Sequence, residues 1–245
     1  MVTSRYLPGT SFTSETDLKK TFAALALAAT LMPFTSAQAA VISYSNSIGM
    51  AVTDWSRSLS FNKFDTKLGT LTSIQFDLSG VVNASGEVEN RSGSAANVTV
   101  WMGSKLELTR PDRSRLVLTN PEYIHLFELT AFDGKRDFDG TSGGRTGPVE
   151  ASGAESFTSS SASDFALFSA LGGGTIDLAL KATGYSRSDA AGNFSSEFES
   201  SASGIAKVTY NYTPFAEVPE PASMALILGG LGLLGLSRRR FGSKA

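Results

Sequence analysis

Glu87 and Glu89 are the two residues whose types and spacing come closest to a catalytic set. On an extended strand, side chains two positions apart project from the same face, with their Cα atoms about 6–7 Å apart. Glycoside hydrolysis needs only two suitably separated carboxyl groups, so one hypothesis is a carboxylate-based polysaccharide hydrolase or lyase. Every exposed strand with two acidic residues has this spacing, and a solvated acidic face is the alternative interpretation.

Nucleophilic catalysis has less support. The chain has no cysteine and one histidine, His125, on which a Ser-His-Asp arrangement would depend. Residues 140–144 match Gly-x-Ser-x-Gly around Ser142, but a nucleophile elbow needs a strand before it and a helix after it, and neither is expected here. Ser60 and Lys63 match Ser-x-x-Lys on a strand and its exit rather than on a helix. We therefore expect no catalytic residues, no cofactor and no enzymatic activity.

Metal binding is a further hypothesis. Asp137 and Asp139, followed by Gly140, resemble part of a calcium loop, and Asp133 is a further candidate ligand. The full loop pattern is missing, because Lys135 occupies the first ligand position and a threonine stands where the closing glutamate belongs. A turn with solvated aspartates is the alternative.

Aromatic residues offer a carbohydrate-binding hypothesis. Trp55, Trp101 and Tyr123 would provide a platform for a sugar ring. Trp101 lies between Val100 and Met102 on its strand and should point away from their core. Burial under a loop or under a second sheet is the alternative for all three.

Short strands must position these residues. Trp55, Leu59 and Phe61 alternate with serines, and the same period of two recurs along the chain. The other alternating segments are 74–78, 98–102, 106–108, 116–118, 176–180 and 206–212. Without a convincing helical period, this pattern predicts an all-β, antiparallel β-sandwich over residues 40–214, with a jelly roll as the nearest variant. Residues 123–132 are expected to form a buried strand or, alternatively, a short helix.

Two segments interrupt the alternation. Residues 133–164 are rich in Gly, Ser and Asp, which predicts a long surface excursion or two loops around a weak edge strand. Residues 186–203 are similar, although Phe194 and Phe198 indicate a strand in a solvent-facing hairpin. Exposed loops of this kind are where a sandwich would carry a binding function.

Charge and cysteine content restrict the partners. Between Ala40 and Glu217 the chain has 14 Lys and Arg against 20 Asp and Glu, a net charge of about −6. No basic patch is visible, so nucleic acid is not an expected partner. Because there is no cysteine, the hydrophobic core alone must stabilise the fold.

The N-terminal residues 1–39 have the pattern of a secretory signal peptide. Lys19 and Lys20 precede the apolar stretch 22–32, and Ala37 and Ala39 supply the small residues of a cleavage site. Export through the secretion translocon and cleavage by signal peptidase would leave a mature chain that begins at Ala40.

The C-terminal residues 215–245 read as a membrane segment with an orientation signal. The uncharged run 222–236 would span about 22 Å as a helix, enough for a marginal transmembrane helix. The positive-inside rule keeps Arg238, Arg239 and Arg240 in the cytoplasm and places the preceding domain across the inner membrane.

The order of motifs at this end resembles a known sorting signal. Val218, Pro219, Glu220 and Pro221, followed by the apolar run and the arginines, are similar to the PEP-CTERM signal of Gram-negative bacteria. The resemblance implies cleavage near the Pro-Glu-Pro triplet by an exosortase, a membrane-embedded enzyme of organisms that make exopolysaccharide and biofilm matrix. It also implies transient anchoring in the inner membrane, followed by transfer to the cell surface or the extracellular matrix.

Four runs inside the domain resemble the choice-anchor E family of surface proteins. They are FDTKLGTL at 64–71, VEN at 88–90, DFDGTSG at 137–143 and VTYNY at 208–212. This resemblance implies an architecture and a surface location without catalytic residues. We therefore expect a structural, adhesive or exopolysaccharide-associated protein. A polysaccharide hydrolase or lyase, a carbohydrate-binding module and a periplasmic small-ligand module remain as alternatives.

Overall fold

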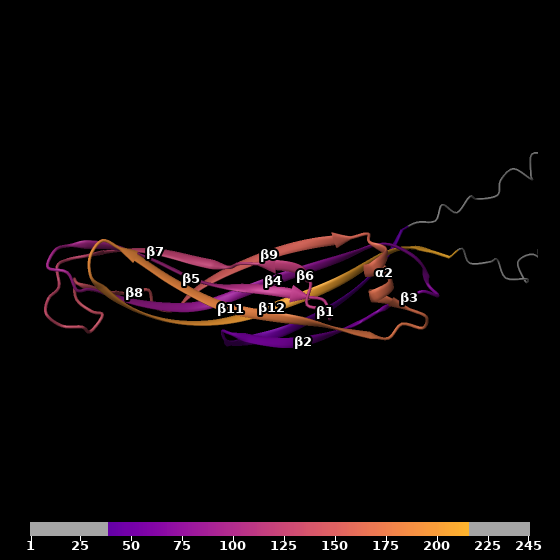
Figure 1. Cartoon of the computed structure of the whole chain (residues 1–245), viewed down its shortest axis with the longest axis horizontal. Helices are drawn as coiled ribbons and strands as arrows, with labels where there is room; N and C mark the ends of the chain where they lie inside the picture. Colours follow the sequence, from indigo (N-terminus) through magenta and orange to yellow (C-terminus); the bar gives the residue numbers. More distant parts are fainter. Residues whose placement is uncertain (1–38, 216–245) are drawn as a thin grey trace, which may run out of the picture. The chain divides into compact units, whose positions relative to one another are not determined.

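The computed structural model describes residues 39–215, which form twelve strands and one short helix (Figure 1). The strands are β1 Ala40–Val52, β2 Trp55–Asn62, β3 Phe64–Asp65, β4 Gly69–Asn90, β5 Ala96–Thr109, β6 Arg115–Thr119, β7 Glu122–Leu129, β8 Gly143–Arg145, β9 Val149–Ser159, β10 Ser169–Ala170, β11 Thr175–Ala190 and β12 Phe194–Pro214; the helix is α2, Ala162–Phe168. β1 begins at the residue that we expect to start the mature chain.

The strands form two five-stranded antiparallel sheets. Sheet 1 has the order β1-β12-β4-β8, with β9 also paired to β4, and sheet 2 has the order β2-β11-β5-β6, with β7 also paired to β5. A two-residue parallel pair joins β10 to β3. The arrangement confirms the predicted all-β antiparallel sandwich.

The core lies between the two sheets and has two parts. The larger part combines side chains such as Phe76 and Val208 from sheet 1 with Leu108 and Leu178 from sheet 2. The smaller part gathers around Val88, Val98, Val100, Met102 and Phe127. The alternating apolar residues of the sequence therefore do face one another across the sandwich.

Leu106 shows how closely the sheets approach. A Cβ atom on Gly80 or Gly204 would come within 3.0 Å of the Leu106 side chain. These neighbouring glycines of β4 and β12 therefore leave the space that the leucine of the opposite sheet fills.

The chain enters and leaves this unit at the same end. Ala40 at the start of β1 pairs with Tyr212, and Gly69 at the start of β4 pairs with Pro214. We call this the proximal end; α2 and β3 also lie here (Figure 1). At the opposite, distal end, Asn90 pairs with Phe194, and residues 130–142 connect β7 to β8.

The two irregular segments are more ordered than predicted. Residues 133–164 contain β8 and β9, a weakly alternating edge strand as predicted, and also the first turn of α2, which the sequence did not reveal. Residues 186–203 comprise the end of β11 and the start of β12, which belong to different sheets and do not pair, so the predicted hairpin was wrong. Phe194 and Phe198 lie in a strand, as predicted, and pack against the smaller core part. Residues 123–132 contain β7, which confirms a strand rather than a helix.

Several predictions lie outside the described residues. They are the signal peptide up to residue 38 with Ala37, the motif residues Val218, Pro219, Glu220 and Pro221, the apolar run 222–236, and Arg238, Arg239 and Arg240. Within residues 39–215, no helix is long and apolar enough to cross a bilayer.

The start of α2 gives a first testable prediction. The Ser161 hydroxyl accepts a hydrogen bond from the backbone N–H of Asp164 at 3.2 Å and thereby caps the helix. Ser161→Ala should lower the free energy of unfolding by about 1 kcal/mol. Chemical denaturation measures the change, with the nearby exposed Ser160→Ala as control. Equal losses in both variants would show that the cap does not stabilise the helix.

Candidate functional site

The two carboxylates of β4 have different environments. Glu87 lies at the surface, where its Oε1 is 3.3 Å from Nη1 of Arg145. Glu89 is 0% exposed, and its Oε2 accepts a hydrogen bond from the backbone N–H of Phe138 at 2.8 Å. The solvated acidic face proposed for this pair is therefore wrong for Glu89, and the two residues form no open pair.

The loop that covers Glu89 is held by Arg145. Its Nε and Nη2 donate hydrogen bonds to the carbonyl oxygens of Phe138 and Asp137 at 3.2 and 2.9 Å. The Phe138 ring is buried, although its φ of 56° lies in the left-handed region. Gly143 packs against this loop, because a Cβ atom at this position would meet the backbone of Phe138 and Asp139. The alternation of apolar and polar residues in β4 predicts neither the loop that covers Glu89 nor the glycine that packs against this loop.

The other catalytic candidates are also separated from one another. Ser142 is fully buried and followed by β8 rather than a helix, and its Oγ has no hydrogen-bond partner within the described part of the chain. His125 packs against the rings of Tyr123 and Phe127, at centroid distances of 6.3 and 4.5 Å. Ser60 lies in β2 and Lys63 follows that strand, as expected.

The calcium candidates each stabilise a turn. Asp133 accepts the N–H of Lys135 at 2.8 Å, Asp137 accepts that of Asp139 at 3.2 Å, and Asp139 accepts that of Gly140 at 2.8 Å. Among residues 39–215, no three acidic or histidine side chains gather as a metal site would require. These contacts are typical of the alternative interpretation, aspartates in turns.

The three predicted platform residues do not lie together. Trp55 is 8% exposed in the larger core part, and Tyr123 is partly buried against the smaller one, which is the burial given as the alternative for these residues. Trp101 lies partly exposed between the buried Val100 and Met102, and it points outward as predicted.

Trp101 has a cation and an aromatic neighbour on the outer face of sheet 2. The guanidinium of Arg187, its partner on β11, lies 4.0 Å from the centroid of the indole ring. Two residues away on each strand, Tyr185 pairs with Gly103. A Cβ atom on Gly103 would lie 2.5 Å from Cζ and from Oη of Tyr185, so the phenol ring lies across the glycine along the sheet. We call Trp101, Tyr185 and Arg187 the sheet 2 platform.

The Tyr185 ring is held at its hydroxyl group. Burial of the phenol and its hydrogen bond to Glu122 on β7 raise the pKa of Tyr185 to about 12. The hydroxyl is therefore protonated at physiological pH and donates to the carboxylate. The sequence alone does not indicate the role of Tyr185, because this role depends on a strand register that places the residue opposite a glycine.

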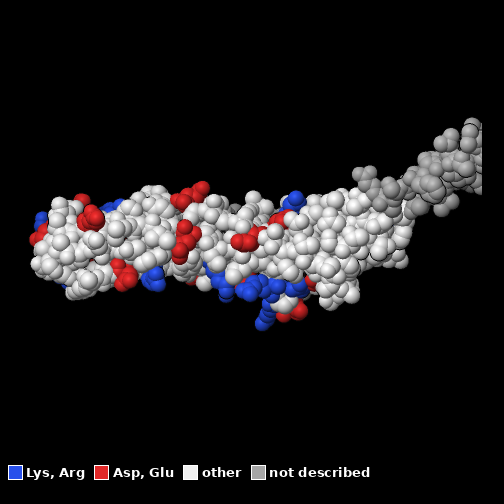
Figure 2. Space-filling model, turned by 90° about the horizontal axis from the view of Figure 1, so that it is seen from above, with Lys and Arg blue, Asp and Glu red and all other residues white. Residues whose placement is uncertain are grey.

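Apolar and basic side chains surround the platform. Ile124 and Leu126 on β7 belong to the large apolar side chains that are exposed, at 53% and 50%. Lys105 and Lys181 lie on the same outer face, opposite Thr183 and Glu107 in the β5–β11 register. On the face that Figure 2 presents, Lys and Arg gather mainly in one stretch, whereas Asp and Glu are dispersed. The net negative charge of the domain is thus not uniform over its surface.

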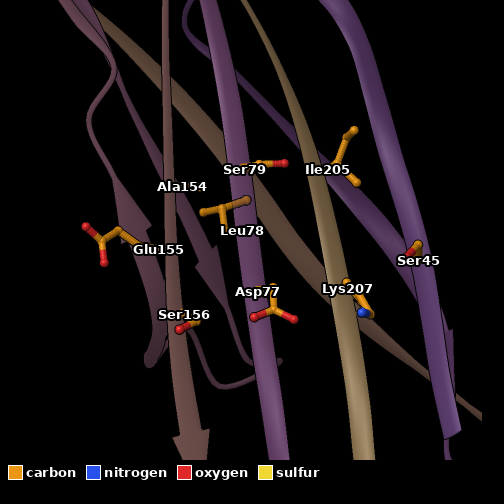
Figure 3. A pocket seen from close by; sticks show the side chains of 9 residues that line it. All are labelled: Ser45, Asp77, Leu78, Ser79, Ala154, Glu155, Ser156, Ile205 and Lys207. Carbon is orange, nitrogen blue, oxygen red and sulfur yellow. The ribbon is translucent and has the colours of Figure 1, made fainter.

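The outer face of sheet 1 has different chemistry. A shallow depression of about 400 Å³ crosses four strands of this sheet. Short side chains such as Ser45, Asp77, Ser79 and Ser156 line it, together with Lys207 (Figure 3). It differs from the deep apolar pocket that a small-ligand module would require.

Residues 217–240 match the PEP-CTERM protein-sorting motif. The motif indicates an exported protein that an exosortase processes at the membrane and that then reaches the cell surface or extracellular space. No curated protein matches the chain.

Solved structures of infectious bursal disease virus give weak similarities. A structure of the Gx strain is 14% identical over 82% of this chain and 50% of that chain, with a TM-score of 0.15. A VP2 subviral particle is 11% identical over 86% and 53%, with a TM-score of 0.17. The chain therefore spans about half the length of these viral chains, and similarities at this level support no functional argument.

Proposed function

We propose that this chain is a noncatalytic protein of the cell surface or extracellular matrix, and that the sheet 2 platform binds exopolysaccharide. The observation that carries the proposal is the Tyr185 ring, which lies across Gly103 beside the outward-facing Trp101. Pyranose rings present apolar C–H faces that pack on flat aromatic surfaces. A ring that is already held along the sheet loses little conformational freedom when a sugar binds.

The charges near the platform favour an anionic polysaccharide. Arg187 is part of the platform, and Lys105 and Lys181 lie on the same face. The nearby Glu122 and Glu107 are already engaged, the first with Tyr185 and the second with Lys105 at 4.0 Å, whereas the exposed Asp189 lies two residues beyond Arg187 on the same face. Lys181 and Arg187 have no carboxylate partner among the described ion pairs, which leaves their charges for carboxylate or sulfate groups of the glycan.

The course of the chain supports display of this face. Because Ala40 and Pro214 both lie at the proximal end, a domain anchored through its C-terminal segment extends its strands away from the anchor. The outer face of sheet 2 is then accessible to polymer in the surrounding matrix. A hydrolase or lyase has less support, because Glu89 is buried and Glu87 is paired with Arg145.

Removal of the two rings tests the platform. The double variant Trp101→Ala, Tyr185→Ala should lose most binding to exopolysaccharide isolated from the producing cells, measured by affinity electrophoresis with the purified exported protein. Phe157→Ala removes an exposed ring from sheet 1 and is the matched control. Circular dichroism verifies that all variants are folded. Equal binding by the double variant and the control would contradict the proposed site.

A further inference from the structure

Strand β1 is an edge of sheet 1 with an unusual composition. Among the described strands only β12 pairs with it, so its other side presents backbone groups without a strand partner. Its sequence, AVISYSNSIGMAV, has no charged residue and no proline. Val41, Met50 and Val52 are also exposed, at 59%, 43% and 78%.

The other edges of the sandwich carry charge. β9, on the opposite side of sheet 1, contains Glu150 and Glu155. In sheet 2, β2 contains Arg57 and β7 contains two glutamates, whereas β6 has only five residues and begins with Arg115. Charges and short length are the usual means by which proteins prevent pairing at edge strands. β1 is the only edge of the described sandwich that lacks both.

The regular part of β1 is long enough for strand pairing. Ala40 to Ile48 pair with β12 in unbroken register, and the first irregularity falls between Ile48 and Ala51. A groove of about 340 Å³ lies along this part, lined by Ile42 and Tyr44 of β1 and by Phe64 and Leu68 across from them. An added strand would hydrogen-bond to β1 and place alternate side chains at this groove, as in other cases of strand addition.

We propose that β1 pairs antiparallel with β1 of a second copy of this chain, about a two-fold axis at Tyr44. This register places Ser43 opposite Ser45 on the outer face and Ile42 opposite Asn46 on the inner face. No charge meets a like charge, because the strand has none. A two-fold axis uses the same surface on both copies, so one uncharged edge suffices.

The pairing has a geometric consequence for adhesion. Antiparallel β1 strands place the proximal ends of the two copies at opposite ends of a continuous sheet. Two copies anchored side by side in one membrane cannot adopt this arrangement, whereas released copies, or copies on facing cells, can. The contact is independent of polysaccharide binding, which the proposal above assigns to sheet 2.

Two double variants on one sheet give a matched test. Ser43, Thr209, Gln75 and Thr158 form one row across sheet 1. Ser45, Lys207, Asp77 and Ser156 form the next, as Figure 3 shows. The variant Ser43→Lys, Ser45→Lys places lysines opposite lysines at the proposed contact. The control, Ser156→Lys, Thr158→Lys, also introduces two lysines in the same rows, at the other edge.

Sedimentation equilibrium of the exported protein measures the outcome. The parent and the β9 control should sediment as dimers and the β1 variant as a monomer, with unchanged circular dichroism in all three. Because the chain lacks cysteine, Tyr44→Cys should also give a disulfide-linked dimer on oxidation, whereas Thr158→Cys should not. A monomeric parent at all concentrations, or equal dimerisation of both lysine variants without the Tyr44→Cys crosslink, would overturn the proposal.

Discussion

Replacement of Arg110 by alanine should lower the free energy of unfolding by about 3 kcal/mol, because it leaves a buried carboxylate without its cation. Nε and Nη2 of Arg110 donate to the two carboxylate oxygens of Asp164 at 2.7 and 2.9 Å. The Asp164 side chain is only 5% exposed. Nη1 also donates to Ser114 and to the carbonyl oxygen of Arg115, so Arg110 connects the turn after β5 with helix α2.

The pH dependence identifies the ion pair as the cause. Hydrogen bonds from Arg110 hold the pKa of Asp164 below its ordinary value. A depressed carboxyl pKa contributes stability above the unfolded pKa of about 3.9, and this contribution is lost as the pH falls through the folded pKa. The stability difference between the parent and Arg110→Ala should therefore be constant near neutrality and shrink below about pH 4.

Denaturant titrations at several pH values measure this difference. Arg113→Ala, in the same turn but without an ion pair among the described contacts, is the control and should change stability little. A loss for Arg110→Ala that matches the control, or one that persists unchanged at acidic pH, would contradict the assigned role.

Several strands could be predicted from the sequence because apolar and polar residues alternate within each of them, whereas β1 was not predicted. The alternation of Trp55, Leu59 and Phe61 with serines directly determines which face of β2 is buried. The full length of β4 and β12 was not predicted, because their other segments contain small residues such as Gly, Ala and Ser without strong contrast. The seven residues of α2 are too few to show a helical period.

Contacts between distant segments could not be predicted in the same way. Glu89 is buried by Phe138, which is 49 residues away and belongs to a loop. Tyr185 becomes a platform residue only because β11 pairs with β5 in a register that places it opposite Gly103. The outward direction of Trp101 was predictable because its two neighbours on the same strand determine it.

Loss of the sorting motif should have the largest effect on the cell. The variant Pro219→Ala, Pro221→Ala should remain unprocessed at the membrane and disappear from the cell surface. Each proline fixes its own φ and restricts the preceding residue to an extended conformation, and an extended backbone suits binding in an enzyme cleft. Immunoblots of membrane and surface fractions measure the distribution.

Pro214→Ala is the control for this prediction, since Pro214 precedes the matched residues 217–240. It should be processed like the parent. Normal surface display of the motif variant would show that another signal directs the protein to the surface.

The central claim is that this sandwich is released from its terminal signals and displayed outside the cell. Mass spectrometry of the intact protein purified from the cell surface tests it most directly. We expect a chain that begins near Ala40 and ends near Pro219. A surface protein that still carries Arg238, Arg239 and Arg240 on most molecules would contradict it.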